Sequence, residues 1–408
     1  MRRIMSVSRV PLRVAQRLLK SLPYDGWGLG REYSPEARRV RRRLASERWR
    51  RFPAVARPFL VIVLRGLWLA YSLELARHAV RGAAPEQRFR LWRRAVKRAW
   101  LYGSLPRITV ADASRPMPFN RVGNLDDSHW VRLWSVLGDR AVDGLVRDKL
   151  ATAERITSFG AKTPRVFCEL ARGGTVDSAK LPWPADGMLF VKPRRGAAAR
   201  GAMSLSRLAG DMYLVNGARL ESSATLATRL NALAARGPLL VQEFCRPTRE
   251  THDLSAETCV QIRISCARYP GERNFVADGF VVIQPPKDHA ATTMTTALAV
   301  PVEPRTGVME RGYFRRDPAH LYEAVPWNGA TVFRRQAPAY QAAVNMVLSA
   351  SSAFPNVPLL GWDVLVTDEG PVILEANTGL GWDLLHAWHN SAGVPSTVLP
   401  VVMAWLST

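Results

Sequence analysis

Cysteine and histidine are scarce in this chain of 408 residues, which contains 4 cysteines and 7 histidines. The cysteines show neither CxxC nor Cys/His spacing, and the histidines form no metal motif; the four thiols are Cys168, Cys245, Cys259 and Cys266. This pattern argues against a disulfide framework and a zinc site, and we expect buried thiols in a reducing compartment. The 47% hydrophobic content indicates a globular protein, with one large core or several smaller domains. The sequence has no internal repeats, and its only low-complexity segments are arginine runs.

Acidic residues are few near the N-terminus. Residues 1–100 hold 25 Lys/Arg and 6 Asp/Glu, a net charge of +19 out of +23 for the whole chain. The other 308 residues hold 32 basic and 28 acidic residues, a net charge of only +4. The segment lacks an apolar core of signal-peptide length and a small-residue cleavage site, so we do not expect secretion.

Long uncharged apolar runs are also missing. The run "FLVIVLRGLWLAYSL" at residues 59–73 is interrupted by Arg65. A spanning helix needs about 20 apolar residues, and a central arginine is costly, so we do not expect a transmembrane span. Two interpretations stay open: a helical subdomain packed on the rest of the protein, or peripheral attachment to an anionic membrane surface. Nucleic-acid binding is disfavoured, because no helix-turn-helix, zinc-finger or RNP-like pattern accompanies the charge.

The remaining chain alternates strand and helix patterns. We expect helices at residues 149–157, 225–235 and 333–351, and a period-two strand in "CVQIRISCARY" at residues 259–269. Two further strands, residues 362–367 and 371–376, flank the turn sequence Asp-Glu-Gly. Mixed strands and helices with many antiparallel pairs favour an α+β fold.

This last hairpin places acids inside apolar strands. With a three-residue loop at 368–370, the expected cross-strand pairs are Thr367–Pro371, Leu365–Ile373 and Asp363–Glu375. Asn377 lies two residues beyond Glu375 and therefore on the same face. Two facing carboxylates repel each other, and a divalent cation reverses that repulsion. Hard oxygen ligands of this kind suit Mg²⁺, and the alternative is that arginines neutralise each acid.

Three other stretches are candidates for phosphate or base contacts. "LFVKPRRGAAARG" ends a strand at Lys192 and enters a loop whose small residues, including Gly196 and Gly201, let backbone N–H groups approach phosphate closely. Lys149 opens a helix, and "LLVQEF" ends a strand at Glu243-Phe244, where backbone and ring would meet an adenine. Taken singly, each stretch has an ordinary structural interpretation. Lys192 fits a solvated strand end, Lys149 fits a surface lysine, and Glu243 fits a residue at a sheet edge.

In this order the stretches resemble the ATP-grasp superfamily, and "GWDVLVTDEGPVILEANTGLGWDLL" and "SAETCVQIRISCA" look like its sugar-transfer-associated family. The resemblance covers residues 145–389. It implies two α+β subdomains that hold ATP between them, residues 106–245 with a linker and a Gly-rich flap, and residues 246–408 with the Mg²⁺ hairpin. Residues 1–105 form a basic, mainly helical region outside it.

The resemblance also implies roles for single residues. The expected phosphate contacts are Lys149, Lys192 and the flap glycines Gly196 and Gly201. The expected adenine and ribose contacts are Glu243, Phe244 and Asp253. The expected Mg²⁺ ligands are Asp363, Glu375 and Asn377. The expected catalytic cations are Arg263 and Lys192.

The function implied is an ATP- and Mg²⁺-dependent ligase. Such an enzyme activates a carboxylate as an acyl phosphate for attack by an amine-type nucleophile, here in cell-surface polysaccharide or sugar-conjugate biosynthesis. We expect small-molecule or sugar-linked substrates and a cytoplasmic protein, either in the cytosol or peripheral at the inner membrane face. The alternatives are a phosphotransferase on the same fold and a non-enzymatic basic adaptor for membranes or nucleic acids.

Two features limit this expectation. "PKDHAATTMTTALAV" at residues 286–300 stands where the family pattern has an Asp-Asn and a Gly-Gly stretch, so the acceptor side is not defined. His386 and His389 follow the hairpin, and neither is identifiable as a general base.

Overall fold

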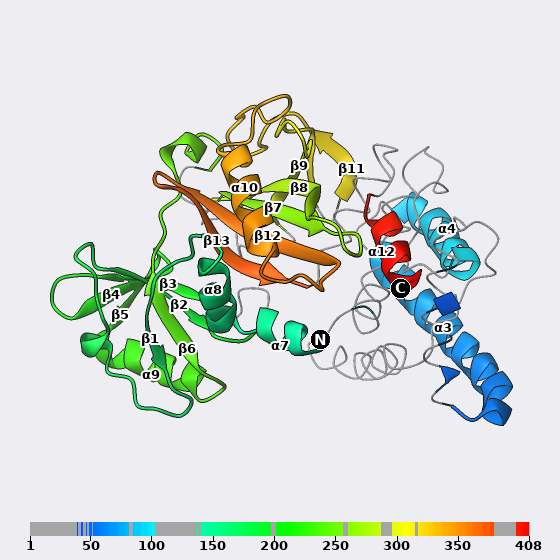
Figure 1. Ribbon diagram of the computed structural model, residues 1–408, viewed down its shortest axis with the longest axis horizontal. Helices are drawn as coiled ribbons and strands as arrows, with labels where there is room; N and C mark the ends of the chain where they lie inside the picture. The colour runs from blue at the N-terminus through cyan, green and yellow to red at the C-terminus, as the bar shows by residue number, and fades with distance from the viewer. Residues whose placement is uncertain are drawn as a thin grey trace.

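The computed structural model describes residues 39, 42–43, 46, 49–50, 52–80, 85–102, 137, 140–196, 201–255, 260–286, 296–314, 317–378 and 397–407. These residues form two antiparallel sheets and a separate pair of N-terminal helices (Figure 1). The α+β expectation is confirmed.

The first sheet has six strands in the order β1-β6-β2-β3-β4-β5. They are β1 (Val166–Leu170), β2 (Met188–Pro193), β3 (Met203–Arg207), β4 (Met212–Val215), β5 (Arg219–Ser222) and β6 (Leu239–Glu243). Helix α9 (Ser223–Ala234) covers one face, and the short helix η3 (Ser178–Lys180) packs nearby. Ser222 caps α9 by accepting a hydrogen bond from the backbone N–H of Thr225, and Leu226 and Leu230, four residues apart, are buried on the sheet side.

The second sheet has seven strands in the order β11-β10-β9-β8-β7-β12-β13. They are β7 (Val260–Ala267), β8 (Phe275–Ile283), β9 (Leu298–Val302), β10 (Gly312–Phe314), β11 (Asp317–Tyr322), β12 (Leu359–Thr367) and β13 (Gly370–Asn377). Strands β9 and β12 are buried almost throughout because both faces of the sheet are covered. Helix α10 (Tyr340–Ser351) packs into one core, and α12 (Val398–Ser407) packs into the other.

Helices α7 (Arg140–Val146) and α8 (Lys149–Thr157) precede the first sheet in the chain. Their buried side chains nevertheless join the core of the second sheet, to which Val146 and Ile156 belong. The segment between the two sheets contains the short helix η4 (Arg249–Thr251). In Figure 1, α8 lies between the first sheet and the β12–β13 hairpin, where it can reach both.

The N-terminal helices are α3 (Arg57–Ala79) and α4 (Pro85–Tyr102), preceded by η1 (Ala54–Ala56). They pack on each other and lie apart from the first sheet (Figure 1). Residues 54–78 form one helical segment that is long and apolar enough to cross a membrane by length and composition, and a third of its apolar window is buried. The apolar run at residues 59–73 is therefore only part of the helix, which extends beyond it at both ends. The expectation that this helix does not span a membrane stays a prediction.

The helix expected at residues 333–351 is wrong at its start, since α10 begins at Tyr340. Arg334 and Ala339 have φ angles of 63° and 47°, in the left-handed region, which ends a right-handed helix. The residues between them form a bridge instead, with Gln336 opposite Val308.

Candidate active site

The β12–β13 hairpin brings the acids of its two strands together. Asp363 lies opposite Glu375, as expected, and Gly361 lies opposite Asn377. The expected loop is wrong by one residue, because Thr367 pairs with Gly370 and not with Pro371. Gly370 has a φ of 102°, a conformation that favours glycine and that closes the tighter turn.

A bulge restores the pairing of the acids. The register shifts between Asp363 and Val364, so that Val364 faces Ile373 and Leu374 has no partner across the strand. The expected pair of Leu365 with Ile373 is therefore also wrong, since Leu365 faces Val372. Two one-residue errors cancel, and the carboxylates face each other.

Asp363 is bound by an arginine. Arg263 lies directly opposite on β7, and its guanidinium donates to both oxygens of the buried Asp363 carboxylate, with Nε···Oδ1 of 2.6 Å and Nη2···Oδ2 of 3.0 Å. The side-chain amide of Asn377 donates to Oδ2 at 3.2 Å. Neutralisation by arginine, the alternative to a metal, is thus present for Asp363.

Glu375 has lysines as its cationic neighbours. Its carboxylate lies 3.9 Å from Nζ of Lys149. Burial raises the pKa of Glu375, and the negative charge of Asp363 raises it further, against the opposing influence of Lys149 and Lys192. A cation between the two carboxylates would relieve both the desolvation and the repulsion.

Lys192 connects the two sheets. It lies at the end of β2 in the first sheet, and its Nζ donates to the backbone oxygen of Leu374 at 3.1 Å, on the bulge of the second sheet. Burial lowers the pKa of Lys192 to about 8, and Lys149 lowers it while Glu375 raises it. A narrow cavity of about 20 Å³, room for a single water molecule, is lined by Lys192, Lys149 and Glu375 among others.

Lys149 is fixed at the first turn of α8 next to the flap. Its Nζ donates to the backbone oxygen of Gly196 at 2.7 Å, and its backbone N–H donates to Arg194 at 3.1 Å. Gly196 and Gly201, at the two ends of the flap, have φ angles of 138° and 81°, which an L side chain rarely adopts. Flap residues 197–200 lie outside the described residues.

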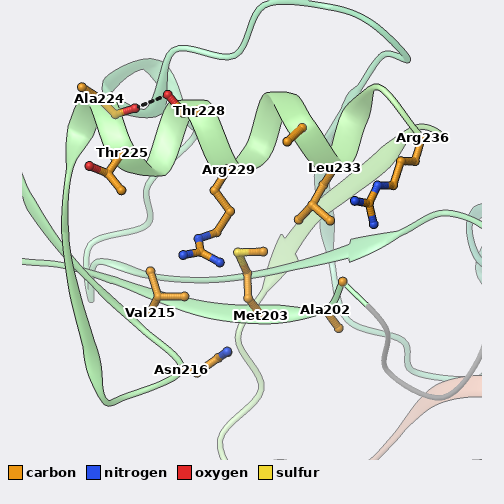
Figure 2. A pocket seen from close by; sticks show the side chains of 12 residues that line it. Ala202, Met203, Val215, Asn216, Ala224, Thr225, Thr228, Arg229, Leu233 and Arg236 are labelled. Atoms are coloured by element: carbon orange, nitrogen blue, oxygen red, sulfur yellow. Dashed lines mark hydrogen bonds between the residues drawn. The ribbon is translucent and has the colours of Figure 1, made fainter. Parts of the chain in front are cut away.

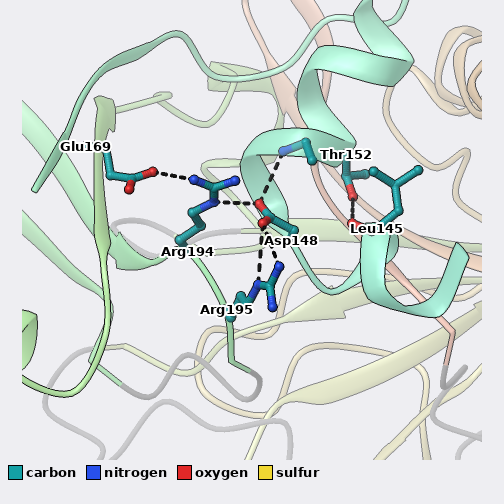
Figure 3. A network of polar contacts seen from close by, with 7 residues as sticks. Leu145, Asp148, Thr152, Glu169, Arg194 and Arg195 are labelled. Carbon is teal, nitrogen blue, oxygen red and sulfur yellow. Dashed lines mark hydrogen bonds and ion pairs between the residues drawn. The ribbon is translucent and has the colours of Figure 1, made fainter. Parts of the chain in front are cut away.

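Asp148 holds the base of this flap, a contact that the sequence did not reveal. It caps α8 by accepting from the backbone N–H of Ala151, and it accepts from Nε of Arg194 at 2.8 Å and Nη2 of Arg195 at 3.2 Å. Figure 3 shows Asp148 between these two guanidiniums, with Glu169 on the other side of Arg194 at 2.8 Å. Burial raises the pKa of Asp148, but the hydrogen bonds from Arg194, Ala151 and Arg195 outweigh it and hold that pKa below its usual range.

The predicted base-contacting residues are less closely joined to this cluster. Glu243 ends β6, is exposed, and accepts from the backbone N–H of Arg165 at 3.2 Å; Phe244, next to it, is half-buried. Asp253 is exposed and bound through both oxygens by Arg335, so the structure does not bring it to the lysines. His386 and His389 lie outside the described residues.

A larger hollow lies elsewhere in the described residues. A groove of about 720 Å³ runs between α9 and strands β3 and β4, and Gly201 is the only predicted site residue in it (Figure 2). Its central cation, Arg229, is neutralised by the buried Glu221, with Nε···Oε2 of 3.1 Å. The other lining cation, Arg236, is exposed, and because none of the described carboxylates lines the groove, it is a weaker candidate for metal-dependent chemistry than the small cavity between the sheets.

The donor set of the hairpin fits Mg²⁺. It consists of two facing carboxylates and one amide, all of which provide the hard oxygen ligands that this ion prefers. Among the described residues, no group of three His, Cys, Asp or Glu side chains converges, so Asn377 and non-protein oxygens would have to complete the coordination. The raised pKa of Glu375 indicates a site where positive charge is favourable.

The model of one protein family, sugar-transfer associated ATP-grasp, matches residues 131–395. This match covers more than half of the chain and includes both sheets and the hairpin. The chain is therefore an ATP-grasp protein. More narrowly, it belongs to the sugar-transfer associated ATP-grasp family, and the resemblance seen in the motifs is confirmed.

Solved structures similar to the chain are ATP-grasp ligases at low identity. D-alanine–D-alanine ligase from Bacillus anthracis shares 15% identity over 64% of this chain and 66% of its own, with a TM-score of 0.38. L-amino acid ligase from Bacillus licheniformis shares 13% identity over 74% of this chain and 60% of its own, with a TM-score of 0.41. The chain thus spans less than two thirds of the length of these proteins. No curated protein sequence matches the chain.

Proposed function

We propose that the chain is an ATP- and Mg²⁺-dependent ligase that activates a carboxylate as an acyl phosphate and joins it to an amine-type nucleophile. One observation carries the proposal. Lys149 from α8, Lys192 from the first sheet and Glu375 from the second line one cavity, and Asp363 lies directly across the hairpin from Glu375. Convergent cations and carboxylates from separate elements are typical of a site that handles phosphate and metal.

The lysines would bind the phosphates of ATP. Both ammonium groups are held by backbone oxygens and point into the space between the sheets, so little ordering is needed when phosphate arrives. Glycines at the ends of the flap allow its backbone N–H groups to approach the phosphates. Glu243 and Phe244 would contact the adenine; Asp253 is not included, because Arg335 binds its carboxylate.

Asp363, Glu375 and Asn377 would hold Mg²⁺, with the amide of Asn377 turned so that Oδ1 faces the ion. When bound, the ion offsets the charge of the phosphates. Arg263, which is bound to Asp363, would orient that carboxylate and add positive charge beside it.

The proposed reaction has two steps. An oxygen of the substrate carboxylate attacks the γ-phosphorus, the bond to the β-phosphate oxygen breaks, and ADP leaves. The amine then attacks the acyl carbon, inorganic phosphate leaves, and the amine proton passes to solvent. Lys192 and Arg263 stabilise the charge that moves between ATP and the acceptor, and the flap excludes water from the acyl phosphate.

The substrate class rests on the description of the family. A sugar-transfer associated enzyme fits a role in cell-surface polysaccharide or sugar-conjugate synthesis in the cytoplasm, with a small-molecule or sugar-linked carboxylate. Because the proposed nucleophile is an amine, the bond that forms to the acyl carbon is a carbon–nitrogen bond.

A substrate screen tests the proposal. The full chain, ATP and Mg²⁺ are incubated with pairs of carboxylates and amines, and ADP, free phosphate and new amides are measured. A ligase gives all three products in equal amounts for one pair, whereas a phosphotransferase gives ADP and a stable phosphoester without free phosphate. Glu375→Gln should abolish ADP release, and Glu369→Gln, in the exposed turn of the same hairpin, should not.

Equal activity in both variants, or no binding of ATP with Mg²⁺, would contradict the proposal. Nucleotide binding is measured separately with ATP and Mg²⁺ alone, so that a missing substrate and an inactive site give different results.

A further inference from the structure

Helix α3 is apolar on two sides. One side is buried through residues spaced three and four apart, which are Leu64, Trp68, Tyr71 and Leu75, and the indole N–H of Trp68 donates to the backbone oxygen of Ala99 on α4 at 3.4 Å. The indole N–H of Trp100 on α4 donates to the hydroxyl of Ser72 at 2.9 Å and fixes this contact. These residues account for one face of the helix.

The other side is exposed. We call it the α3 apolar face, and it consists of Val55, Phe59, Ile62, Val63 and Leu69. Phe59 is 70% exposed and Ile62 is 71% exposed. A helix that is apolar all round is normally buried all round, and contiguous apolar surface marks an interaction site.

Positive charge is abundant on both helices. Residues 57–102 contain 10 Lys/Arg and 2 Asp/Glu. Arg65 is exposed on α3 beside Ile62, and exposed cations continue along α4 at Arg90, Arg93 and Lys97. One of the two acids, Glu74, is bound by His78 at 2.9 Å. Exposed apolar side chains on α3 and exposed cations on α3 and α4 are the two kinds of group that bind a protein to the surface of an anionic bilayer.

The same charges argue against two other occupants. A second copy of this face would bring two strongly basic surfaces together, which costs free energy. A spanning arrangement would place Arg65 in the hydrocarbon, together with the cations of α4 if the α3–α4 packing is kept. A surface position leaves all of these cations in the headgroup layer.

We infer that the α3 apolar face binds peripherally to an anionic lipid surface, with the exposed cations of α3 and α4 against the headgroups. This attachment would hold an ATP-grasp protein at a membrane surface. It does not depend on the proposed reaction.

The test is vesicle flotation of the full chain. Binding is expected to vesicles of phosphatidylcholine with phosphatidylglycerol, to weaken with salt, and to be slight with phosphatidylcholine alone. Phe59→Ser and Ile62→Ser should each weaken binding about tenfold. Leu220→Ser is the control, because Leu220 on β5 is also an exposed apolar side chain, with 57% exposure, but is not part of the α3 apolar face. This variant should not change binding.

The electrostatic part has its own pair of variants. Arg90→Gln and Arg93→Gln should each weaken binding about fivefold, and Arg172→Gln, exposed in the first subdomain, should not. Unfolding temperatures show that each variant is folded.

Three results would overturn the inference. The first is equal binding by the Ile62 and Leu220 variants. The second is retention in the membrane after alkaline carbonate washing, which indicates a span. The third is a lipid-independent dimer that Ile62→Ser dissociates.

Discussion

Replacing Lys192 with arginine should change how nucleotide affinity depends on pH. The pKa of Lys192 is about 8 because burial disfavours its charged form, whereas an arginine stays charged throughout this range. Only the charged form attracts phosphate. At pH 9 about one Lys192 in eleven is protonated, so the affinity of the native chain for ATP with Mg²⁺ should be about tenfold lower than at pH 7.

The lysine also has a stability signature in the absence of nucleotide. Its pKa is lowered from 10.5 to about 8 on folding. Between these two values the unfolded chain binds more protons, so the free energy of unfolding should rise with pH there, by about 3 kcal/mol from this residue. Lys192→Met should lack this rise.

Calorimetric titration with ATP and Mg²⁺ between pH 7 and pH 9, in two buffers of different ionisation enthalpy, measures both affinity and proton uptake. The native chain should take up a proton on binding near pH 9, and Lys192→Arg should take up none. Lys162→Arg, at an exposed lysine, is the control and should behave as the native chain does. An equally steep loss of affinity in Lys192→Arg would refute the assignment of Lys192 to phosphate.

Two further pairs of variants test the flap base and the backbone. Asp148→Asn should raise the KM for ATP several-fold more than Glu169→Gln in steady-state assays, because both acids bind Arg194 but only Asp148 belongs to α8; equal effects would contradict this account. Gly307→Ala should cost about 3 kcal/mol in urea unfolding, because its Cβ would lie 2.7 Å from Cδ1 of Tyr340 at a φ of 79°. Gly329→Ala, with a φ of 74° and open space around it, should cost about 1 kcal/mol, and similar losses at both glycines would argue against the crowding.

The facing acids could be predicted from the sequence because the side-chain period of a strand is fixed at two. Once Asp363 and Glu375 lie on paired strands, only their register remains open. The turn and the bulge at Leu374 could not be predicted, since the choice between a two-residue and a three-residue turn is a small difference in local energy. The predicted pairing of Asp363 with Glu375 is confirmed because the shorter turn and the bulge shift the register by one residue in opposite directions.

The contacts of Asp148 could not be read from the sequence for another reason. Asp148 and Arg194 are 46 residues apart, and their pairing follows from how α8 meets the first sheet. The arginines after Lys192-Pro193 are visible in the sequence, but nothing local marks their partner. By contrast, the start of a helix at Lys149 could be predicted, because aspartate is a preferred N-cap residue and Asp148 directly precedes it.

The interpretation of Asp363 shows the limit of a motif. Two buried acids indicate positive charge nearby, and both a metal and an arginine satisfy that condition. In the structure Arg263 on β7 lies directly opposite Asp363 on β12, and the alternating pattern of β7 alone could not assign this partner in advance.

Helix α8 has consequences for motion, because its C-terminal part packs on the second sheet and its first turn is bonded to the first sheet. Ile156 is anchored in the core of the second sheet, and the first turn is bonded to Arg194 and Gly196 of the first. A hinge movement of one sheet relative to the other must therefore either rotate α8 as a rigid unit or separate its first turn from Arg194 and Gly196. In the first case Lys149 stays bonded to Gly196 and moves relative to the second sheet, and in the second case it separates from Gly196. Either way, opening the molecule and loosening its hold on a triphosphate become a single event.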